Sequence, residues 1–253
     1  MTTLDPTQHR EAWPDSSAGS LPTRLPPKHE PLVKRVFATI AFLADASRRR
    51  RTGRRALWLM VVSLATAGIM LLAYPFYTHF YAKQTQTTLV KKIESFKGAQ
   101  GIEAYKVQRI KAGAALTRLI VPKLHLDVIV VQGTTGNALR AGAGHYEDTA
   151  LPGDFGNVAI AGHRTGFGEP FRHLEALHEG DVIVLETPIG RYTYNVIGDF
   201  DAHPNPWITS AKDLSVIQPT SDPSLTLTTC DPPHTSLNRL IVRAKLTKTE
   251  LKV

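Results

Sequence analysis

The chain contains one cysteine, Cys230, among its 253 residues. With a single thiol no intramolecular disulfide can form, so the fold has to be held together by its apolar core. The sequence also has no CxxC pair, which argues against thiol–disulfide exchange. A lone thiol is most often a small buried hydrophobic group. It becomes a candidate nucleophile only where suitable basic side chains lie near it.

Asp, Glu, Lys and Arg are absent from one continuous stretch, residues 56–80. Before it, residues 1–55 hold 11 Lys and Arg against 5 Asp and Glu; after it, residues 81–253 hold 19 against 17. The formal charge of +8 therefore comes mainly from a local run that includes six arginines between Arg48 and Arg55. A basic excess that is confined to one run does not favour nucleic-acid binding by the rest of the chain, so no nucleic-acid partner is expected.

The uncharged stretch predicts a transmembrane helix. A helix from Ala56 to Thr78 would span roughly 35 Å, which is enough to cross a bilayer core of about 30 Å. Trp58 lies near one end and three tyrosines lie near the other, as is typical of membrane interfaces, and the preceding arginines place the N terminus in the cytoplasm. The alternatives are a buried core helix and a signal peptide cleaved after Ala65-Thr-Ala67. Because the apolar residues continue well past that site, we favour an uncleaved anchor.

Composition divides the chain into four predicted segments. Residues 1–55 are expected to form a disordered, basic cytoplasmic tail, with a short helix over 32–47 that lies on the membrane. Residues 56–80 are the expected signal anchor in the plasma membrane. Residues 81–113 are polar and rich in lysine, and they predict a juxtamembrane helix and spacer that lifts the next domain off the lipid. Residues 114–253 are expected to fold as one domain outside the cytoplasm, in a single-pass protein.

The domain from residue 114 onward reads as all-β. Short β-branched runs alternate with Gly and Pro, which is typical of a barrel or a sandwich. Residues 135–141 and 170–177 predict short helices, the second opening at a proline. The proline-rich stretch 201–223 has little strand character, and such long connections are often functional. The expected strands are 116–121, 126–132, 156–163, 181–187, 190–200, 224–230 and 238–246.

A thiol, an imidazole and a guanidinium stand at the ends of predicted strands. Because side chains alternate across a strand, Cys230 shares the face of Thr228, opposite Leu225 and Leu227. By the same rule, His163 lies at the end of strand 156–163. Arg239 and Arg243 share one face of the last strand. The three strands would form one site if they were neighbours in the sheet.

These three groups suit nucleophilic acyl transfer. A thiolate attacks a carbonyl, and a nearby imidazole favours the thiolate and later protonates the departing amine. An arginine stays charged and offers fixed donors to the oxyanion of a tetrahedral intermediate. The acyl thioester can then react with an amine in place of water. One feature opposes this reading: Asp231 follows the thiol, where an inward-pointing negative charge would disfavour the thiolate.

Four segments of the sequence match a known family: LPG at 151–153, GNVAIAGHR at 156–164, TLTTC at 226–230 and NRLIV at 238–242. Together they resemble the sortases, the membrane-anchored cysteine transpeptidases of bacterial surfaces, and most of all their classes E and D. The resemblance covers about residues 115–250 and agrees with an N-terminal anchor. It implies an eight-stranded β-barrel with short helices, preceded by one transmembrane helix.

The resemblance also implies roles for individual residues. Cys230 would be the nucleophile, His163 the general acid and base, and Arg239 the residue that stabilises the oxyanion. The substrate would lie near Thr229 and three further residues, Thr228, His145 and Trp207. His145 competes with His163 for the role of base because the GAGHY segment also resembles a sortase motif. Trp207 could instead plug one end of the barrel, and Arg243 is expected on the barrel surface.

The partners follow from the same resemblance. A sortase cuts a C-terminal sorting signal of the LPxTG or LAxTG kind after its threonine. It joins that threonine to an amine on a cell-wall precursor or on another surface protein. No cofactor is expected. Some sortases bind calcium, but the carboxylates Glu147, Asp148, Asp154 and Glu169 do not form a recognisable metal motif.

Two other functions use the same residues. The first is a thiol protease of the papain kind, in which water takes the acyl group. The second is a membrane-tethered binding barrel without enzymatic activity. A protease would release the cut peptide without joining it to an amine, and a binding barrel would not need Cys230.

Overall fold

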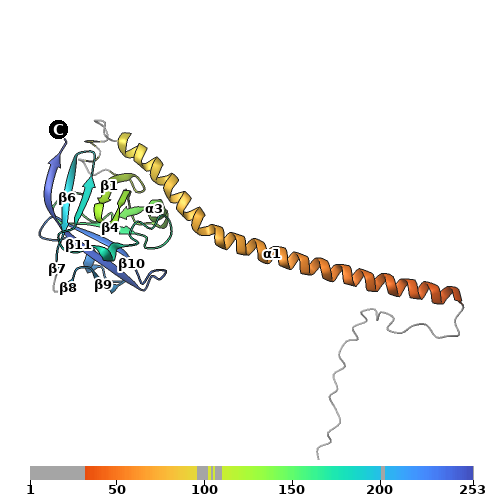
Figure 1. Ribbon diagram of the computed structural model, residues 1–253. Helices are drawn as coiled ribbons and strands as arrows, with labels where there is room; N and C mark the ends of the chain where they lie inside the picture. Colours follow the sequence, from red (N-terminus) through yellow and green to blue (C-terminus); the bar gives the residue numbers. More distant parts are fainter. Residues whose placement is uncertain (1–31, 96–101, 104, 106–109, 201–202, 253) are drawn as a thin grey trace, which may run out of the picture. The chain divides into compact units, whose positions relative to one another are not determined.

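The computed structural model describes residues 32–95, 102–103, 105, 110–200 and 203–252 (Figure 1). The disorder predicted for residues 1–31 lies outside the described residues. Residues 32–47, for which we expected a short helix, are helical, but the helix does not end there: it continues through residues 48–55 as the first part of helix α1 (Leu32–Ser95). The chain divides into two compact units, Met1–Ile69 and Met70–Val253. The second unit contains the end of α1 and every strand.

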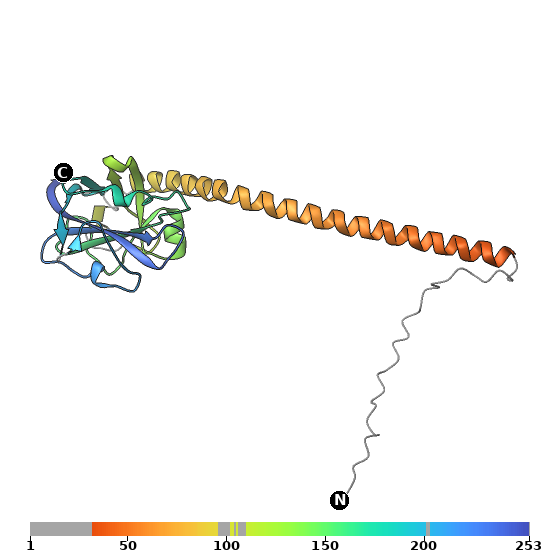
Figure 2. The same ribbon diagram turned by 60° about the horizontal axis from the view of Figure 1, so that its bottom comes forward.

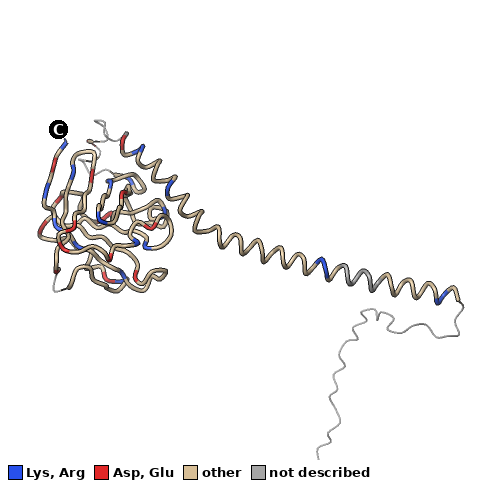
Figure 3. Tube along the Cα trace, in the orientation of Figure 1, with Lys and Arg blue, Asp and Glu red and all other residues tan. Residues whose placement is uncertain are grey.

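Helix α1 contains the predicted membrane span. It is the one helix in the described part of the chain that is long and apolar enough to cross a bilayer, between Thr52 and Glu94. Figure 3 shows the uncharged stretch as a continuous tan section of α1 between charged residues. None of its most apolar window is buried in the structure. This exposure does not fit the alternative of a buried core helix, which would hide these side chains from solvent.

Eight strands close into a barrel. The hydrogen-bonded order is β10-β4-β3-β2-β1-β5-β6-β11, and a pairing between β10 and β11 completes the ring (Figure 1). This confirms the expected eight-stranded barrel with short helices. The strands are β1 (Ala115–Val121), β2 (Leu126–Gln132), β3 (Ala143–His145), β4 (Asn157–Gly162), β5 (Val182–Glu186), β6 (Gly190–Val196), β10 (Ser224–Asp231) and β11 (Asn238–Leu251).

The remaining elements are short and are not part of the eight-stranded ring. A ninth strand, β9 (Trp207–Ser210), pairs with the first half of β11 on the side away from β10. The dipeptide strands β7 (Asp199–Phe200) and β8 (His203–Pro204) pair with each other. The short helices are η1 (Pro122–Leu124), α3 (Gly136–Ala141), η2 (Leu174–Ala176) and η3 (Ser215–Ile217).

Three sequence expectations need correction. The predicted helix 170–177 is mostly turns and the 3₁₀ element η2. Phe171, Leu174 and Leu177 are all buried, and their spacing of three suits the three residues per turn of a 3₁₀ helix. The predicted strand 190–200 is two strands, β6 and β7. Strands β3 and β9 were not predicted, the latter because it lies within the stretch that we expected to be poor in strands.

Alternation places the core inside the barrel. Leu225 and Leu227 of β10 point inward and are fully buried, as are Val158 and Ile160 of the adjacent β4. The side chains of Thr226, Thr228 and Cys230 therefore emerge on the outer face. Burying each large aliphatic side chain contributes roughly 1.5–3 kcal/mol, so the strand register is strongly fixed. That register determines which polar groups meet on the outside.

The last turns of α1 pack against the barrel (Figures 1 and 2). Leu89 and Ile93 join a small apolar cluster on β1, β2 and α3. The amide of Gln86 donates to the carbonyl oxygens of Ile129 and Ala141, at 3.1 and 2.6 Å, and accepts from the Ile129 N–H at 2.7 Å. The expected spacer that lifts the domain off the lipid is therefore, up to Ser95, a helix docked on that domain.

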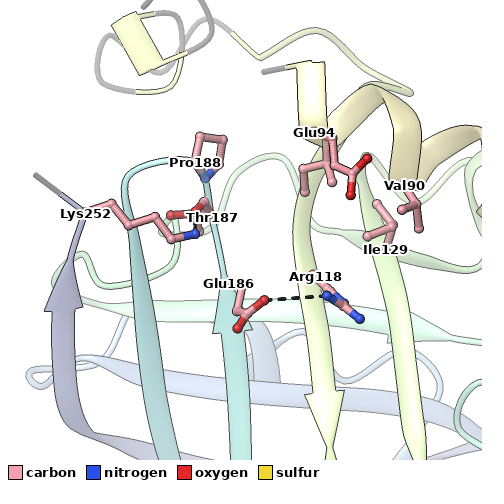
Figure 4. A pocket seen from close by; sticks show the side chains of 9 residues that line it. Val90, Glu94, Arg118, Ile129, Glu186, Thr187, Pro188 and Lys252 are labelled. Atoms are coloured by element: carbon pink, nitrogen blue, oxygen red, sulfur yellow. Dashed lines mark hydrogen bonds and ion pairs between the residues drawn. The ribbon is translucent and has the colours of Figure 1, made fainter. Parts of the chain in front are cut away.

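A small cavity marks the end of this joint. Figure 4 shows Val90 and Glu94 of α1 beside Arg118 of β1, which is ion-paired to Glu186 of β5 at 3.9 Å. The cavity measures about 70 Å³. The cavity is small and Arg118 and Glu186 in its lining are paired with each other, so we interpret it as a gap in the packing between α1 and the barrel.

Candidate active site

Strand register brings the predicted catalytic residues to one end of the barrel. Cys230 of β10 pairs directly with Arg239 of β11 in the antiparallel ladder. On its other side β10 runs parallel to β4, with Thr228 opposite Ala161. Continuing this register by two residues places Cys230 level with His163, which directly follows the last residue of β4. The three strands are neighbours, as a single site requires.

All three groups lie on the outer face of the barrel. Leu240 and Val242 of β11 point into the core, so Arg239 projects outward like Cys230. The thiol is free and partly exposed. The guanidinium of Arg239 donates from Nη1 to the carbonyl oxygens of Asn238, at 2.9 Å, and Ser236, at 3.3 Å. These backbone contacts fix the guanidinium beside the strand that holds the thiol.

The two threonines before the thiol point to opposite sides. Thr229 faces inward, and its hydroxyl donates to the carbonyl oxygen of Gly162 at 2.8 Å, which ties the end of β10 to the end of β4. Thr228 faces outward with Cys230, and its hydroxyl lies 3.4 Å from that of Tyr146. Both threonines are buried. Thr228 thus belongs to the outer floor behind the thiol, whereas Thr229 supports it from within.

His163 lies in a partly desolvated position that keeps its ring neutral. Burial lowers the pKa of His163, and the nearby Arg140 guanidinium lowers this pKa further. The ring also packs against Phe167, with centroids 5.6 Å apart. At neutral pH the imidazole is therefore unprotonated and able to accept a proton.

Arg164, which the sequence reasoning did not select, links three parts of the site. Its Nη1 donates to the Cys230 carbonyl oxygen at 3.3 Å and forms an ion pair with Asp231. Its Nη2 donates to Glu175 of η2 at 3.1 Å. The side chain is nearly buried. The Asp231 carboxylate, which we expected to oppose the thiolate, is therefore paired with a positive charge.

We predict that the Arg164→Gln variant slows the alkylation of Cys230 by iodoacetamide at pH 7 about tenfold. The carboxylate of Asp231, the residue directly after the thiol, would then keep its negative charge without a positive partner. Repulsion between two charges a few ångströms apart is about 1–4 kcal/mol near a protein surface, and about 1.4 kcal/mol corresponds to a factor of ten. Because the chain has one cysteine, mass spectrometry reports this reaction without ambiguity.

The double variant Arg164→Gln/Asp231→Asn separates charge from packing. It lacks both the positive and the negative group, so we expect it to recover most of the lost alkylation rate. A double variant as slow as Arg164→Gln alone would mean that Arg164 acts only by holding the strand end in place.

His145 lies apart from the other candidates. It pairs with Ile160 across β3 and β4 and is fully buried. Its Nδ1 lies 3.0 Å from Gln132 Oε1, and its Nε2 lies 2.9 Å from the Ala150 carbonyl oxygen and 3.0 Å from the Thr149 hydroxyl. The structure therefore places His145 within a buried hydrogen-bond network, and this position does not support the substrate contact that we expected.

The buried position of His145 predicts a pH-dependent stability. Burial lowers its pKa, whereas an unfolded histidine titrates near 6.5. The unfolded chain thus binds more protons just below pH 6.5, so the free energy of unfolding should be complete above that pH and fall as the pH drops. Urea unfolding of the full chain, followed by near-ultraviolet circular dichroism at pH 5.5 and 7.5, measures this loss. His145→Gln should lose stability at both pH values and show a smaller pH effect. If His145→Gln loses as much unfolding free energy between pH 7.5 and pH 5.5 as the wild type does, His145 does not cause this pH dependence.

Trp207 belongs to the long connection that follows β6, and this connection covers Arg243 of β11. Trp207 is 8% exposed and packs with Val216 against Ile241 on the outer face of β11. Arg243, which we expected on the barrel surface, lies on the outer face but is buried. Its guanidinium stacks 4.0 Å from the centroid of the Phe200 ring and donates to the Val216 carbonyl oxygen at 3.2 Å. Little of the Trp207 ring is free to touch a substrate.

Asn157 anchors the same connection and was not selected from the sequence. Its amide donates to the carbonyl oxygens of Val216 and Gln218, at 3.0 and 3.2 Å, and accepts from the Thr226 hydroxyl at 2.7 Å. These bonds fix η3 against the outer face of β4 and β10, at the end of β4 away from His163. Among the described residues, no three His, Cys, Asp or Glu side chains gather so that they could hold a metal ion.

Comparisons with known proteins point to one family. The profile of the sortase domain matches residues 119–247. Sortase SrtE1 of Streptomyces coelicolor is 30% identical over 204 residues, which cover 72% of this chain but only 54% of that relative. A sortase D5 transpeptidase of Clostridium perfringens superposes with a TM-score of 0.56 at 26% identity, over 65% of this chain and 99% of the other.

A second solved structure gives the same result. The SrtF sortase of Corynebacterium diphtheriae superposes with a TM-score of 0.52 at 33% identity, over 57% of this chain and 90% of the other. The relatives include sortases of the E and D types, the two classes that the sequence motifs suggested. The sortase-domain match over half of the chain, the relative that is 30% identical over 72% of it and the eight-stranded barrel together show that the chain belongs to the sortase family.

Proposed function

We propose that this protein is a cysteine transpeptidase that cuts a C-terminal sorting signal and joins the new carboxyl end to an amine. The observation that carries the proposal is the register of three adjacent strands, which sets Cys230, His163 and Arg239 side by side on the outer face. Each group is one that acyl transfer to and from a thiol requires.

In the first half-reaction the neutral imidazole of His163 takes the proton of the Cys230 thiol. The thiolate attacks the carbonyl carbon of the scissile peptide bond, and the guanidinium of Arg239 donates hydrogen bonds to the oxyanion that forms. The protonated His163 then gives its proton to the nitrogen of the leaving peptide. The C–N bond breaks, and an acyl thioester on Cys230 remains.

The second half-reaction reverses these roles. An incoming primary amine attacks the thioester carbonyl while His163 accepts the proton that the amine loses. Arg239 again stabilises the oxyanion. The C–S bond breaks, the sulfur leaves as a thiolate and is protonated again, and a new amide bond joins the two molecules. In this scheme His163 and Cys230 accept and donate every proton, so the proposed chemistry needs no cofactor.

We propose that the substrates are secreted proteins with a signal of the LPxTG or LAxTG kind, cut after the threonine. The amine would come from a cell-wall precursor or from another surface protein. The apolar stretch of α1 would anchor the protein in the plasma membrane by a single pass, with the arginine-rich side in the cytoplasm. The barrel would then act outside the cytoplasm, where both substrates are present.

The deciding experiment incubates the full chain, in detergent micelles, with LPxTG and LAxTG peptides, with and without an amine such as triglycine. Mass spectrometry should detect the peptide joined through its threonine to the amine. Cleavage without joining would favour the thiol protease. Absence of both products and of any acyl adduct on Cys230 would favour the binding barrel.

A further inference from the structure

The loop after His163 has an unusual backbone. Four consecutive residues, Gly166, Phe167, Gly168 and Glu169, have positive φ angles of 77°, 49°, 80° and 49°. Glycine adopts this left-handed region freely, but a side chain such as that of phenylalanine does so only at a cost in free energy. Such a conformation persists where surrounding contacts hold it. The contacts of this loop show what holds it.

On its inner side the loop covers the catalytic imidazole. The Phe167 ring lies against His163, with centroids 5.6 Å apart and planes inclined by 34°. The guanidinium carbon of Arg140, from α3, lies 5.7 Å from the centroid of the same ring. Phe167 thus packs against His163 and keeps part of that side chain away from water.

On its outer side the loop rests on α1. The Tyr81 ring meets the Phe167 ring edge-on, with centroids 6.4 Å apart and planes at 81°. The next residue, Ala82, is buried, and a methyl group added at Gly168 would lie 3.1 Å from its Cβ atom. Two consecutive residues of α1 therefore contact two consecutive residues of the loop.

We propose that Tyr81 and Ala82 of α1 brace the 166–169 loop so that Phe167 holds His163 in its working position. Tyr81 and Phe167 are then positioning residues for the reaction, and this role rests on the function proposed above for His163. Tyr81 directly follows the uncharged stretch of α1, and the Tyr77 ring lies 6.3 Å from its ring. The helix that contains the candidate membrane span is accordingly part of the active-site scaffold.

The brace has an electrostatic consequence. Burial lowers the pKa of His163, so removing a ring that covers it should let this pKa rise towards its usual range. The charged and titratable groups at this end of the barrel come from α1, α3, the loop after β4, β10 and β11. They include Tyr81, Arg140, Arg164, Glu169, Cys230, Asp231 and Arg239, together with Glu175 of η2 and Arg172, which pair with Arg164 and Glu169. The aromatic variants below leave all of them unchanged except Tyr81, whose Tyr81→Phe variant serves as the control for its hydroxyl.

The test compares four variants of the full chain in detergent micelles: Phe167→Ala, Tyr81→Ala, Tyr81→Phe and Phe80→Ala. Phe80 is the neighbouring aromatic residue of α1 and is 66% exposed, so it controls for loss of a ring from the helix. One readout is the titration of the His163 ring by NMR, assigned from the signal that disappears in His163→Gln. The other is kcat and KM for joining a peptide to an amine.

We expect Phe167→Ala and Tyr81→Ala to move the His163 titration to higher pH. Both should lower kcat about tenfold, with a much smaller change in KM, because a displaced acid–base group loses much of its contribution. Tyr81→Phe keeps the ring and should restore both readouts. Phe80→Ala should match the wild type. Equal titration in wild type, Phe167→Ala and Tyr81→Ala would overturn the proposal, as would equal effects of Tyr81→Ala and Phe80→Ala.

The two readouts keep this proposal separate from the proposed function. If the wild type joins no peptide, the proposed function fails, yet the His163 titration still shows whether α1 braces the loop. Thermal unfolding of each variant identifies a loss of fold, and Tyr81 is sufficiently exposed for its truncation to be tolerated.

Discussion

The Cys230→Ala variant should lose both cleavage and joining of the sorting-signal peptide, by about 10⁴-fold or more. No other thiol exists in the chain, so no second cysteine can replace the nucleophile. The side chain is partly exposed at the end of β10, outside the packed core. Its truncation should therefore leave the barrel folded, and the loss can be read as lost chemistry. Steady-state rates and acyl-adduct detection by mass spectrometry measure it.

The Cys230→Ser variant tests whether the thiolate itself matters. Serine fits the same space, but its hydroxyl is far less readily deprotonated than a thiol at neutral pH. We expect activity close to that of Cys230→Ala. Joining at more than a tenth of the wild-type rate in Cys230→Ala would mean that the nucleophile lies elsewhere, whereas the same rate in Cys230→Ser alone would mean that a hydroxyl can replace the thiol. If the wild type joins no peptide and Cys230→Ala binds the sorting-signal peptide as tightly as the wild type does, the binding barrel is supported.

The sequence predicted the barrel because burial follows simple periodicity along its strands. Alternating apolar side chains in 224–230 and 238–246 correctly predicted which face enters the core. From that alternation, the outward direction of Cys230 and Arg239 followed directly. The order of the strands in the sheet was not predictable in the same way, because no pattern within a single segment indicates that β10 lies between β4 and β11. The sequence therefore left open whether the three strands are neighbours, and the strand pairing shows that they are.

The elements that were missed lack a local signal. Strand β3 is Ala-Gly-His, which contains no β-branched residue, and it exists because β2 and β4 pair with it on either side. The docking of α1 depends on Gln86, a polar residue in a polar segment. Its amide bonds to the backbone of β2 only in the folded chain. Propensity and periodicity describe neighbours in sequence, whereas these contacts join residues that are far apart in it.

Buried polar groups were the hardest to predict. The sequence analysis placed Arg243 on the barrel surface, because arginine is seldom buried without a partner, and it gave Arg164 no role. In the structure each has found partners in other segments: Arg243 meets Val216 and Phe200, and Arg164 meets Asp231. The position of Arg164 directly after His163 was the one available signal. It placed a cation at the end of β4, level with the acidic residue after the thiol.

The second large effect concerns Arg239. We expect Arg239→Ala to lower kcat for peptide joining by about 10²–10³, the usual cost of removing one oxyanion donor. Arg239→Lys keeps the charge but loses the planar pair of donors, so it should recover only part of the rate. The KM for the peptide should change much less than kcat, because the oxyanion exists only in the intermediates and transition states.

The matched control is Arg191→Ala. Arg191 is an exposed arginine of β6 that pairs with Glu186 at 3.3 Å and lies opposite Glu250, at the far end of β11 from Arg239. Its loss changes the net charge by the same amount, so a general effect of charge on substrate binding would appear equally in both variants. Arg191→Ala should keep wild-type kcat. If the two variants lose kcat equally, or if Arg239→Ala raises KM alone, then Arg239 does not stabilise the oxyanion. The group that does so must then be sought among backbone N–H donors near Cys230.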